Sequence, residues 1–318
     1  MTIHTCVEKL KQILHYSLAT RHRRRLALVG LLAILYLPDW ISVLVEGILK
    51  GRSDSILNIG FIILGIQPFL KQPNALTQLR AEEDDRWTGY ILLVIASVAL
   101  IIFHSTSPSV TFQAFSVMGL VIGALWSTWG LGFFRQFPVV TLMLLAATYP
   151  HLSFITAEAL RFVTAPDLLE RTMAIVGSWG LTQIGYPAHA EAAIVRMSTG
   201  SVFVAPGCSG FDLAFTLCGL GFLLGRLMQT RWRKTLLVMG AGILLAWIAN
   251  VPRIMLLAIA SVYWGKASFD FWHGPIGGQI FAGIVFTIHY YLAMALIGQE
   301  SPISPPESDP ASINNSQI

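Results

Sequence analysis

Three residues in this sequence carry side chains that could do nucleophilic chemistry together. Cys208 lies in the segment 206–210, Arg253 follows an Asn-Val-Pro sequence, and His273 follows a run of aromatic residues. A thiolate can attack a carbonyl carbon, an imidazole can carry protons, and a guanidinium can hold a carboxylate or a developing negative charge. Because all three lie in or beside long apolar segments, they predict chemistry on a membrane-borne substrate.

The turn around Cys208 predicts an activated thiol. Pro206 and Gly207 end an expected strand, and a helix is expected to begin at Ser209, with Ser209 and Asp212 in a capping arrangement. A cysteine at a helix N-terminus experiences the positive end of the helix dipole, which lowers the pKa of a thiol. The alternative is a small buried cysteine with a structural role, as most free cysteines have.

Arg253 lies inside an apolar segment, where a charge costs at least about 2.5–3.5 kcal/mol on insertion scales. Counted from Lys234, at the cytoplasmic end of the expected span, it lies roughly 28 Å along a helix, near the far boundary of a ~30 Å hydrocarbon core. The apolar run continues to Trp264, so the arginine could instead be recessed below the surface. Asn250, one helical turn earlier, is expected to support the same pocket. The alternative is a snorkelling, structural arginine.

His273 directly precedes the last apolar segment, among aromatic residues typical of the membrane interface. A lone interfacial histidine is usually inert, but counting spans puts His273 on the same side of the membrane as Cys208. We therefore expect Cys208 as the nucleophile, His273 as its acid–base partner and Arg253 as the ligand of a carboxylate or oxyanion. Three further residues are expected to support them: Asn250, Ser209 and Asp212.

The composition is that of a membrane protein. Of 318 residues, 54% are hydrophobic and 12% are charged, against about 25% charged in soluble domains. The net charge is +4, and the cations form no patch of the size that a nucleic-acid groove needs, which argues against nucleic acid as a partner. Three scattered cysteines predict no disulfide framework, and no set of residues in the sequence suggests a metal or a cofactor.

Several apolar segments approach the roughly 20 residues that cross a bilayer, and they predict an all-α polytopic membrane protein with about eight transmembrane helices. The expected spans are 26–45, 56–70, 88–104, 110–129, 133–150, 209–228, 235–264 and 276–298. Between the fifth and the sixth we expect a short extracytoplasmic helix over 167–180 and a β-hairpin with strands 194–197 and 201–204. Residues 1–298 then form a single membrane domain, followed by a disordered tail over 299–318.

The distribution of arginine and lysine predicts the orientation in a cell membrane. The cluster at 21–25 and the cations at 226–234 fall on one side, which the positive-inside rule assigns to the cytoplasm. Both termini are then cytoplasmic, and the interval 151–207 lies on the extracytoplasmic face together with the candidate active site.

The Cys-Ser-Gly sequence at 208–210, the Asn-Val-Pro-Arg-Ile sequence at 250–254 and His273 before a final span resemble the exosortase/archaeosortase family. The motifs cover roughly residues 185–297, with the cyanobacterial exosortases as a candidate branch. The resemblance implies a membrane cysteine protease or transpeptidase in which Cys208 is the nucleophile and Arg253 and His273 complete the triad.

The same resemblance implies the substrates. They would be membrane-anchored exported proteins with a C-terminal sorting signal made of a Pro-Glu-Pro-like motif, a transmembrane helix and a basic cluster. The acyl-enzyme on Cys208 would be passed to an acceptor, such as an amine of a lipid or glycan carrier.

The sequence leaves two other functions open. In a rhomboid-like intramembrane serine protease, Ser209 would be the nucleophile and His273 or His289 its base, but Arg253 would have no role. In a transporter or assembly factor, Arg253 would be a carboxylate or ion site, but the sequence has no clear pair of broken helices in matching halves.

Overall fold

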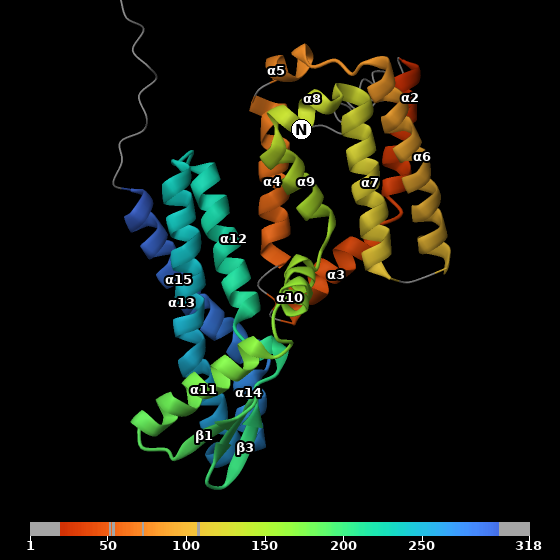
Figure 1. Ribbon diagram of the computed structural model, residues 1–318. Helices are drawn as coiled ribbons and strands as arrows, with labels where there is room; N and C mark the ends of the chain where they lie inside the picture. Colours follow the sequence, from red (N-terminus) through yellow and green to blue (C-terminus); the bar gives the residue numbers. More distant parts are fainter. Residues whose placement is uncertain (1–19, 51, 53–54, 72, 107–108, 299–318) are drawn as a thin grey trace, which may run out of the picture.

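The computed structural model describes residues 20–298, apart from 51, 53–54, 72 and 107–108. The tail at 299–318, for which the sequence predicts disorder, lies outside the described residues. Figure 1 shows two groups of helices side by side, with a smaller layer of helix and sheet at one end of the second group.

The first group contains the N-terminal helices. They are α2 (Arg21–Ala33), α3 (Leu37–Leu49), α4 (Ser55–Lys71), α5 (Pro73–Gln78), α6 (Glu83–Thr106), α7 (Val110–Trp129), α8 (Leu131–Gln136) and α9 (Pro138–Thr148). Glycines set the approach of α6 to α7, because Gly89 faces the backbone of Ser127 and Gly123 faces Leu93. Without side chains at these positions the two helices pack closely, as small residues allow in membrane helices.

The second group contains α12 (Phe211–Leu227), α13 (Trp232–Ile259) with the π-helical turn η2 (Ala260–Trp264), and α15 (Pro275–Ile297). Gly221 and Gly225 on α12 both face α13, which lets these two helices pack tightly. The groups meet where α12 crosses α4, with Gly60 facing Leu223 and Gly219 facing Leu57. The helix α10 (Leu152–Val163) also contacts α12 and so links the groups.

The number of membrane spans differs from the eight expected. Four helices among the described residues are long and apolar enough to cross a membrane, namely α6, α7, α13 with η2, and α15. Two bent helix pairs, α2 with α3 at 44° and α9 with α10 at 101°, raise the number to six if each pair is one span. The helices α4 and α12 have 17 residues each, or about 25 Å, which is shorter than a ~30 Å core. The structure therefore supports an all-α polytopic membrane protein without confirming eight spans.

The smaller layer is built on the far end of α13. It contains α11 (Leu168–Gln183), β1 (Ala188–Glu191), β2 (Ile194–Met197), β3 (Gly200–Phe203) and α14 (Lys266–His273). The sheet is antiparallel in the order β1-β2-β3, so the region has three strands where the sequence predicts a two-stranded hairpin. The unexpected strand, β1, reads Ala-His-Ala-Glu and lacks the β-branched and aromatic residues typical of strands. Its order comes from pairing with β2.

The length of α13 explains the apolar run beyond Arg253. Helix and turn together have 33 residues, or about 50 Å, which exceeds a ~30 Å core. Ile254, Leu257 and Ala258 are buried against Met173 of α11 and Val195 of β2. This part of the helix is apolar because it belongs to a protein core, so the run to Trp264 gives no reason to place Arg253 deep in lipid.

Candidate active site

Cys208 lies in a turn between the sheet and α12. The 3₁₀ turn η1 (Pro206–Cys208) follows β3, and the Cys208 amide donates to the Ala205 carbonyl at 2.8 Å. Ser209 closes the turn, because its hydroxyl donates to the Pro206 carbonyl at 2.7 Å. The helix begins at Phe211 rather than Ser209, and its N-cap residue Gly210 makes no side-chain cap. The helix start therefore lies two residues later than the sequence predicts, and the Ser209 hydroxyl accepts a hydrogen bond from the amide of Phe211, the first helical residue, at 3.4 Å.

Asn250 on α13 holds this turn from the side. Its Nδ2 donates to the Cys208 carbonyl at 2.9 Å, and its side chain is fully buried. Gly210 lies against the same amide with a φ of +81°, and a Cβ added there would lie 3.0 Å from Asn250 Nδ2. Asn250 thus holds the backbone that carries the thiol, and its supporting role in the active site stays a prediction.

We expect Gly210→Ala to destabilise the protein. A left-handed φ costs a residue with a Cβ about 1–2 kcal/mol, and the new methyl group would also press on Asn250. Gly207→Ala is the matched control, because a Cβ there would meet nothing within 4 Å and Gly207 has no left-handed φ. Thermal unfolding in detergent should show a lower midpoint for Gly210→Ala alone. Equal midpoints for the two variants would mean that the turn relaxes without strain.

Cys208 and His273 line one small pocket, although they lie far apart in the sequence. Cys208 comes just before α12, and His273 comes just before α15. This thiol pocket is formed by Cys208, His273, Phe269 and residues of β3 and α13. The imidazole of His273 stacks on the Phe269 ring, with centroids 5.1 Å apart and planes 13° apart. Cys208 and His273 make no hydrogen bond with each other in the described structure. The pocket holds only about 10 Å³ of free space, no more than one water needs, so it is closed around the thiol.

Burial raises the pKa of the Cys208 thiol above its ordinary value, and the positive charge of Arg253 acts in the opposite direction. The desolvation of a thiolate in this apolar cluster is the larger effect. The sequence predicts a lowered pKa from the helix dipole, and that expectation is wrong for this closed arrangement. A thiol that stays protonated needs a base to attack a substrate, and His273 is the titratable group that shares its pocket.

Arg253 lines a second cavity beside the same turn. This arginine cavity is lined by Arg253 together with Gly207, Gly210, Asp212 and Phe281. The guanidinium carbon lies 5.7 Å from the centroid of the Phe281 ring, and its Nε is buried without a hydrogen-bond partner. Among the described residues no acidic side chain pairs with Arg253. A cation that faces a cavity without an anionic partner is suited to bind a negatively charged group.

Ser209 and Asp212 differ in their surroundings. Ser209 is 1% exposed, and its hydroxyl donates to the Pro206 carbonyl and accepts from the Phe211 amide. His289 lies in the middle of α15, where it faces Gly242 of α13. The geometry therefore gives no support to a serine nucleophile. Asp212 is exposed and lines the arginine cavity together with Gly207.

A comparison with protein-family models decides the family. The model described as transmembrane exosortase matches residues 52–290, which is well over half of the chain. The chain belongs to the transmembrane exosortase family. Exosortases are membrane transpeptidases or proteases that act on the sorting signals of exported proteins, which agrees with the apolar helices of the fold. Comparisons with curated proteins and with solved structures gave no match.

The exosortase match begins at Arg52, a residue that the sequence analysis did not single out. A large cavity of about 510 Å³ lies beside the Cys208 turn, and Arg52, His151 and Arg161 line it together with Gly207 and Asp212. It shares Arg52, Gly207 and Asp212 with the arginine cavity, so the two spaces adjoin along the turn. The signal available in the sequence is that Arg52, His151 and Arg161 all fall on the predicted extracytoplasmic side.

Arg161 in this exosortase is already partly neutralised. It donates to Glu158 at 2.6 Å and to Glu170 at 3.1 Å, and the Glu170 side chain is almost fully buried in the contact between α10 and α11. The charge of Arg253 has no such compensation, so it is the stronger candidate for binding an anionic group.

Proposed function

We propose that the chain is a cysteine transpeptidase that cleaves the C-terminal sorting signals of exported proteins and transfers them to an acceptor. The observation that carries the proposal is that Cys208 and His273, from distant segments of the sequence, line one pocket beside Arg253. Membership of the exosortase family supports the same chemistry. The substrates proposed are membrane-anchored proteins with a Pro-Glu-Pro-like motif, a transmembrane helix and a basic cluster.

The proposed reaction begins with proton transfer from Cys208 to His273. The thiolate attacks the carbonyl carbon of the scissile peptide bond, and the charge on the resulting oxyanion is stabilised by a nearby donor, for which Arg253 is the candidate. His273 then gives its proton to the leaving amine, and a thioester on Cys208 remains. An amine of a lipid or glycan acceptor attacks this thioester, loses a proton to His273 and releases the thiolate.

Access to the thiol requires the pocket to open. Phe269 and His273 both lie on α14, a helix of eight residues with no buried member that follows Gly265 and ends before Gly274. A pivot of this helix about Gly274 would move Phe269 outward and give the peptide room, while His273, at the end beside the pivot, stays near the thiol. The energy for opening would come from substrate binding, so the resting enzyme keeps its thiol protonated and covered.

The large cavity is the proposed site for the peptide motif. Its volume of about 510 Å³ lies within the 300–1,000 Å³ that ligand pockets usually have. Arg52 on its wall, with Arg253 in the adjoining cavity, suits a substrate carboxylate. The proposed orientation has both termini in the cytoplasm and this site on the extracytoplasmic face of the cell membrane, where an exported peptide arrives.

The test is to trap the thioester. The enzyme is co-expressed with a candidate exported protein that ends in such a signal, and the complex is analysed by mass spectrometry after rapid denaturation. We expect a hydroxylamine-sensitive acyl adduct on the peptide that contains Cys208. An adduct on Ser209 that resists hydroxylamine, or a processed substrate without any adduct on Cys208, would contradict the mechanism.

A further inference from the structure

A third cavity lies at the opposite end of the molecule from the thiol, where the two helix groups diverge. It has a volume of about 360 Å³ and is bounded by the end of α4, the start of α9 and the end of α12. The helices α4 and α12 touch at Gly60 with Leu223 and at Gly219 with Leu57. Residues further along both helices, ending in Lys71 and Arg226, line the cavity instead.

Two cationic side chains line this cavity, one from each helix group. Lys71 ends α4 and Arg226 lies in the last turn of α12. Arg226 stacks over the Trp232 ring, with its guanidinium carbon 4.7 Å from the centroid, and neither cation pairs with an acidic side chain among the described residues. The lining contains no acidic residue, while Gln67 and Gln229 add amide groups that can donate hydrogen bonds.

The floor of the cavity is apolar. Leu64, Val140 and Met143 line it and are themselves buried. A small inorganic anion would use the cations and leave this floor unfilled, whereas an amphiphilic molecule would use both. The combination of two separated cations, amide donors and an apolar floor between membrane helices suits the head group and upper chains of a phospholipid.

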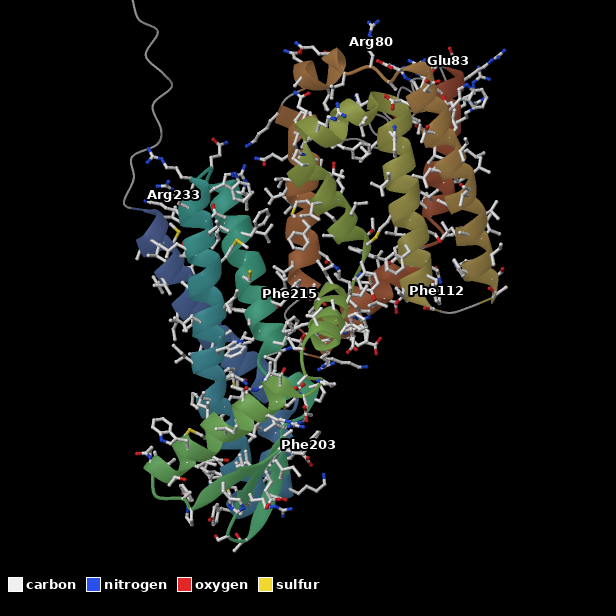
Figure 2. The ribbon with its side chains drawn as sticks, viewed as in Figure 1. Arg80, Glu83, Phe112, Phe203, Phe215 and Arg233 are labelled. Atoms are coloured by element: carbon white, nitrogen blue, oxygen red, sulfur yellow. The ribbon has the colours of Figure 1, made fainter. Side chains whose placement is uncertain are left out.

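The position of the cavity agrees with this ligand. Arg80 and Arg233 lie at the same end of the molecule, as Figure 2 shows, while Phe203, in the smaller layer of helix and sheet, lies at the other end. The positive-inside rule assigns the cation-rich end to the cytoplasmic leaflet, which is rich in anionic lipids. A lipid phosphate bound to both Lys71 and Arg226 would join the two helix groups on the side where their own contacts end.

We propose that this cavity binds the head group of an anionic phospholipid, which bridges the two helix groups through Lys71 and Arg226. The ligand class is a phosphate-bearing lipid with a net negative charge, such as phosphatidylglycerol. The proposal is independent of the peptidase chemistry, because the cavity lies at the far end of the helices from Cys208.

The test measures lipid binding to the full chain, so its result does not depend on activity. The protein is placed in nanodiscs with equal amounts of phosphatidylglycerol and phosphatidylcholine, and native mass spectrometry counts the lipids that remain bound. We expect preferential retention of phosphatidylglycerol, and a decrease of about tenfold or more in its affinity for Lys71→Gln and for Arg226→Gln, since each removes a charge-assisted hydrogen bond. Arg233→Gln is the control, because Arg233 is an exposed cation at the same end that does not line the cavity.

Three results would overturn the proposal. Equal retention of the two lipids would show that the cavity does not select a net negative charge. An equal loss in Arg233→Gln would show that the general surface charge, not the cavity, attracts the lipid. Displacement of phosphatidylglycerol by millimolar inorganic phosphate would show a phosphate site without a lipid contribution.

Discussion

Replacing Cys208 with alanine is expected to abolish cleavage of the sorting signal, with a loss of at least about 10⁴-fold. The thiol is the proposed nucleophile, and among the described residues that line the thiol pocket there is no side-chain hydroxyl, amine or second thiol. The variant should still fold, because Cys208 is a small member of an apolar cluster that alanine can occupy. Processing of a co-expressed substrate, followed by immunoblotting, measures the effect.

Two control variants distinguish the role of the Cys208 thiol in processing from that of nearby side chains. Ser209→Ala removes a hydroxyl that closes the turn, so it should lower stability by about 1 kcal/mol and leave processing largely intact. Cys218→Ala changes the other described free cysteine, ten residues along in α12, and should leave processing unchanged. Retained cleavage in Cys208→Ala together with lost cleavage in Ser209→Ala would instead support a serine protease.

Replacing Arg253 with glutamine is expected to slow processing by about 10²–10³-fold, the usual effect of removing one donor to an oxyanion. Its guanidinium faces a cavity beside the Cys208 turn and has no acidic partner among the described residues. Arg253→Lys keeps the charge but loses the planar fork, so we expect an intermediate rate. Arg196→Gln is the control, because Arg196 lies on β2 and pairs with Glu191 outside the cavities.

The same variant has a second readout in the reactivity of Cys208. The positive charge of Arg253 lowers the pKa of the thiol, against the larger effect of burial. A nearby cation favours the thiolate, so Arg253→Gln should raise this pKa and move the alkylation profile of Cys208 to higher pH. Alkylation rates across a pH series, with Cys6 and Cys218 replaced, test the shift. An unchanged profile together with an unchanged processing rate would leave Arg253 with a structural role.

Much of the candidate site is readable from the sequence, because its signals are local. A cysteine between a strand and a helix, an arginine about one membrane thickness from Lys234, and a histidine before the last apolar segment all follow from spacing and composition. The family match over residues 52–290 confirms the resemblance on which their roles depend. Asn250 is also expected from its place one turn before Arg253, although its contact with the Cys208 carbonyl is visible only in three dimensions.

The span count shows where hydropathy fails. An apolar run indicates that a segment is shielded from water, but it does not indicate whether lipid or protein shields it. The run after Arg253 is apolar because Ile254, Leu257 and Ala258 pack against α11 and the sheet. The run at 209–228 forms a helix of only 17 residues, and the run at 56–70 lies in a helix of the same length, too short for a ~30 Å core. The run at 133–150 contains a break and is followed by a 101° bend into α10.

By itself, then, the sequence determined the membrane class and the family, and it predicted the three chemical groups, because each of these depends on residue types and their spacing along the chain. The tertiary structure decided what surrounds those groups. It raised the pKa of Cys208 by burying it, and it placed His273 and Arg253 in the linings of two different cavities. It also brought Arg52, His151 and Arg161 to the cavity beside them. Burial and long-range contact depend on how helices pack against one another, and glycines such as Gly221, which let two helices approach closely, act only through their neighbours in space.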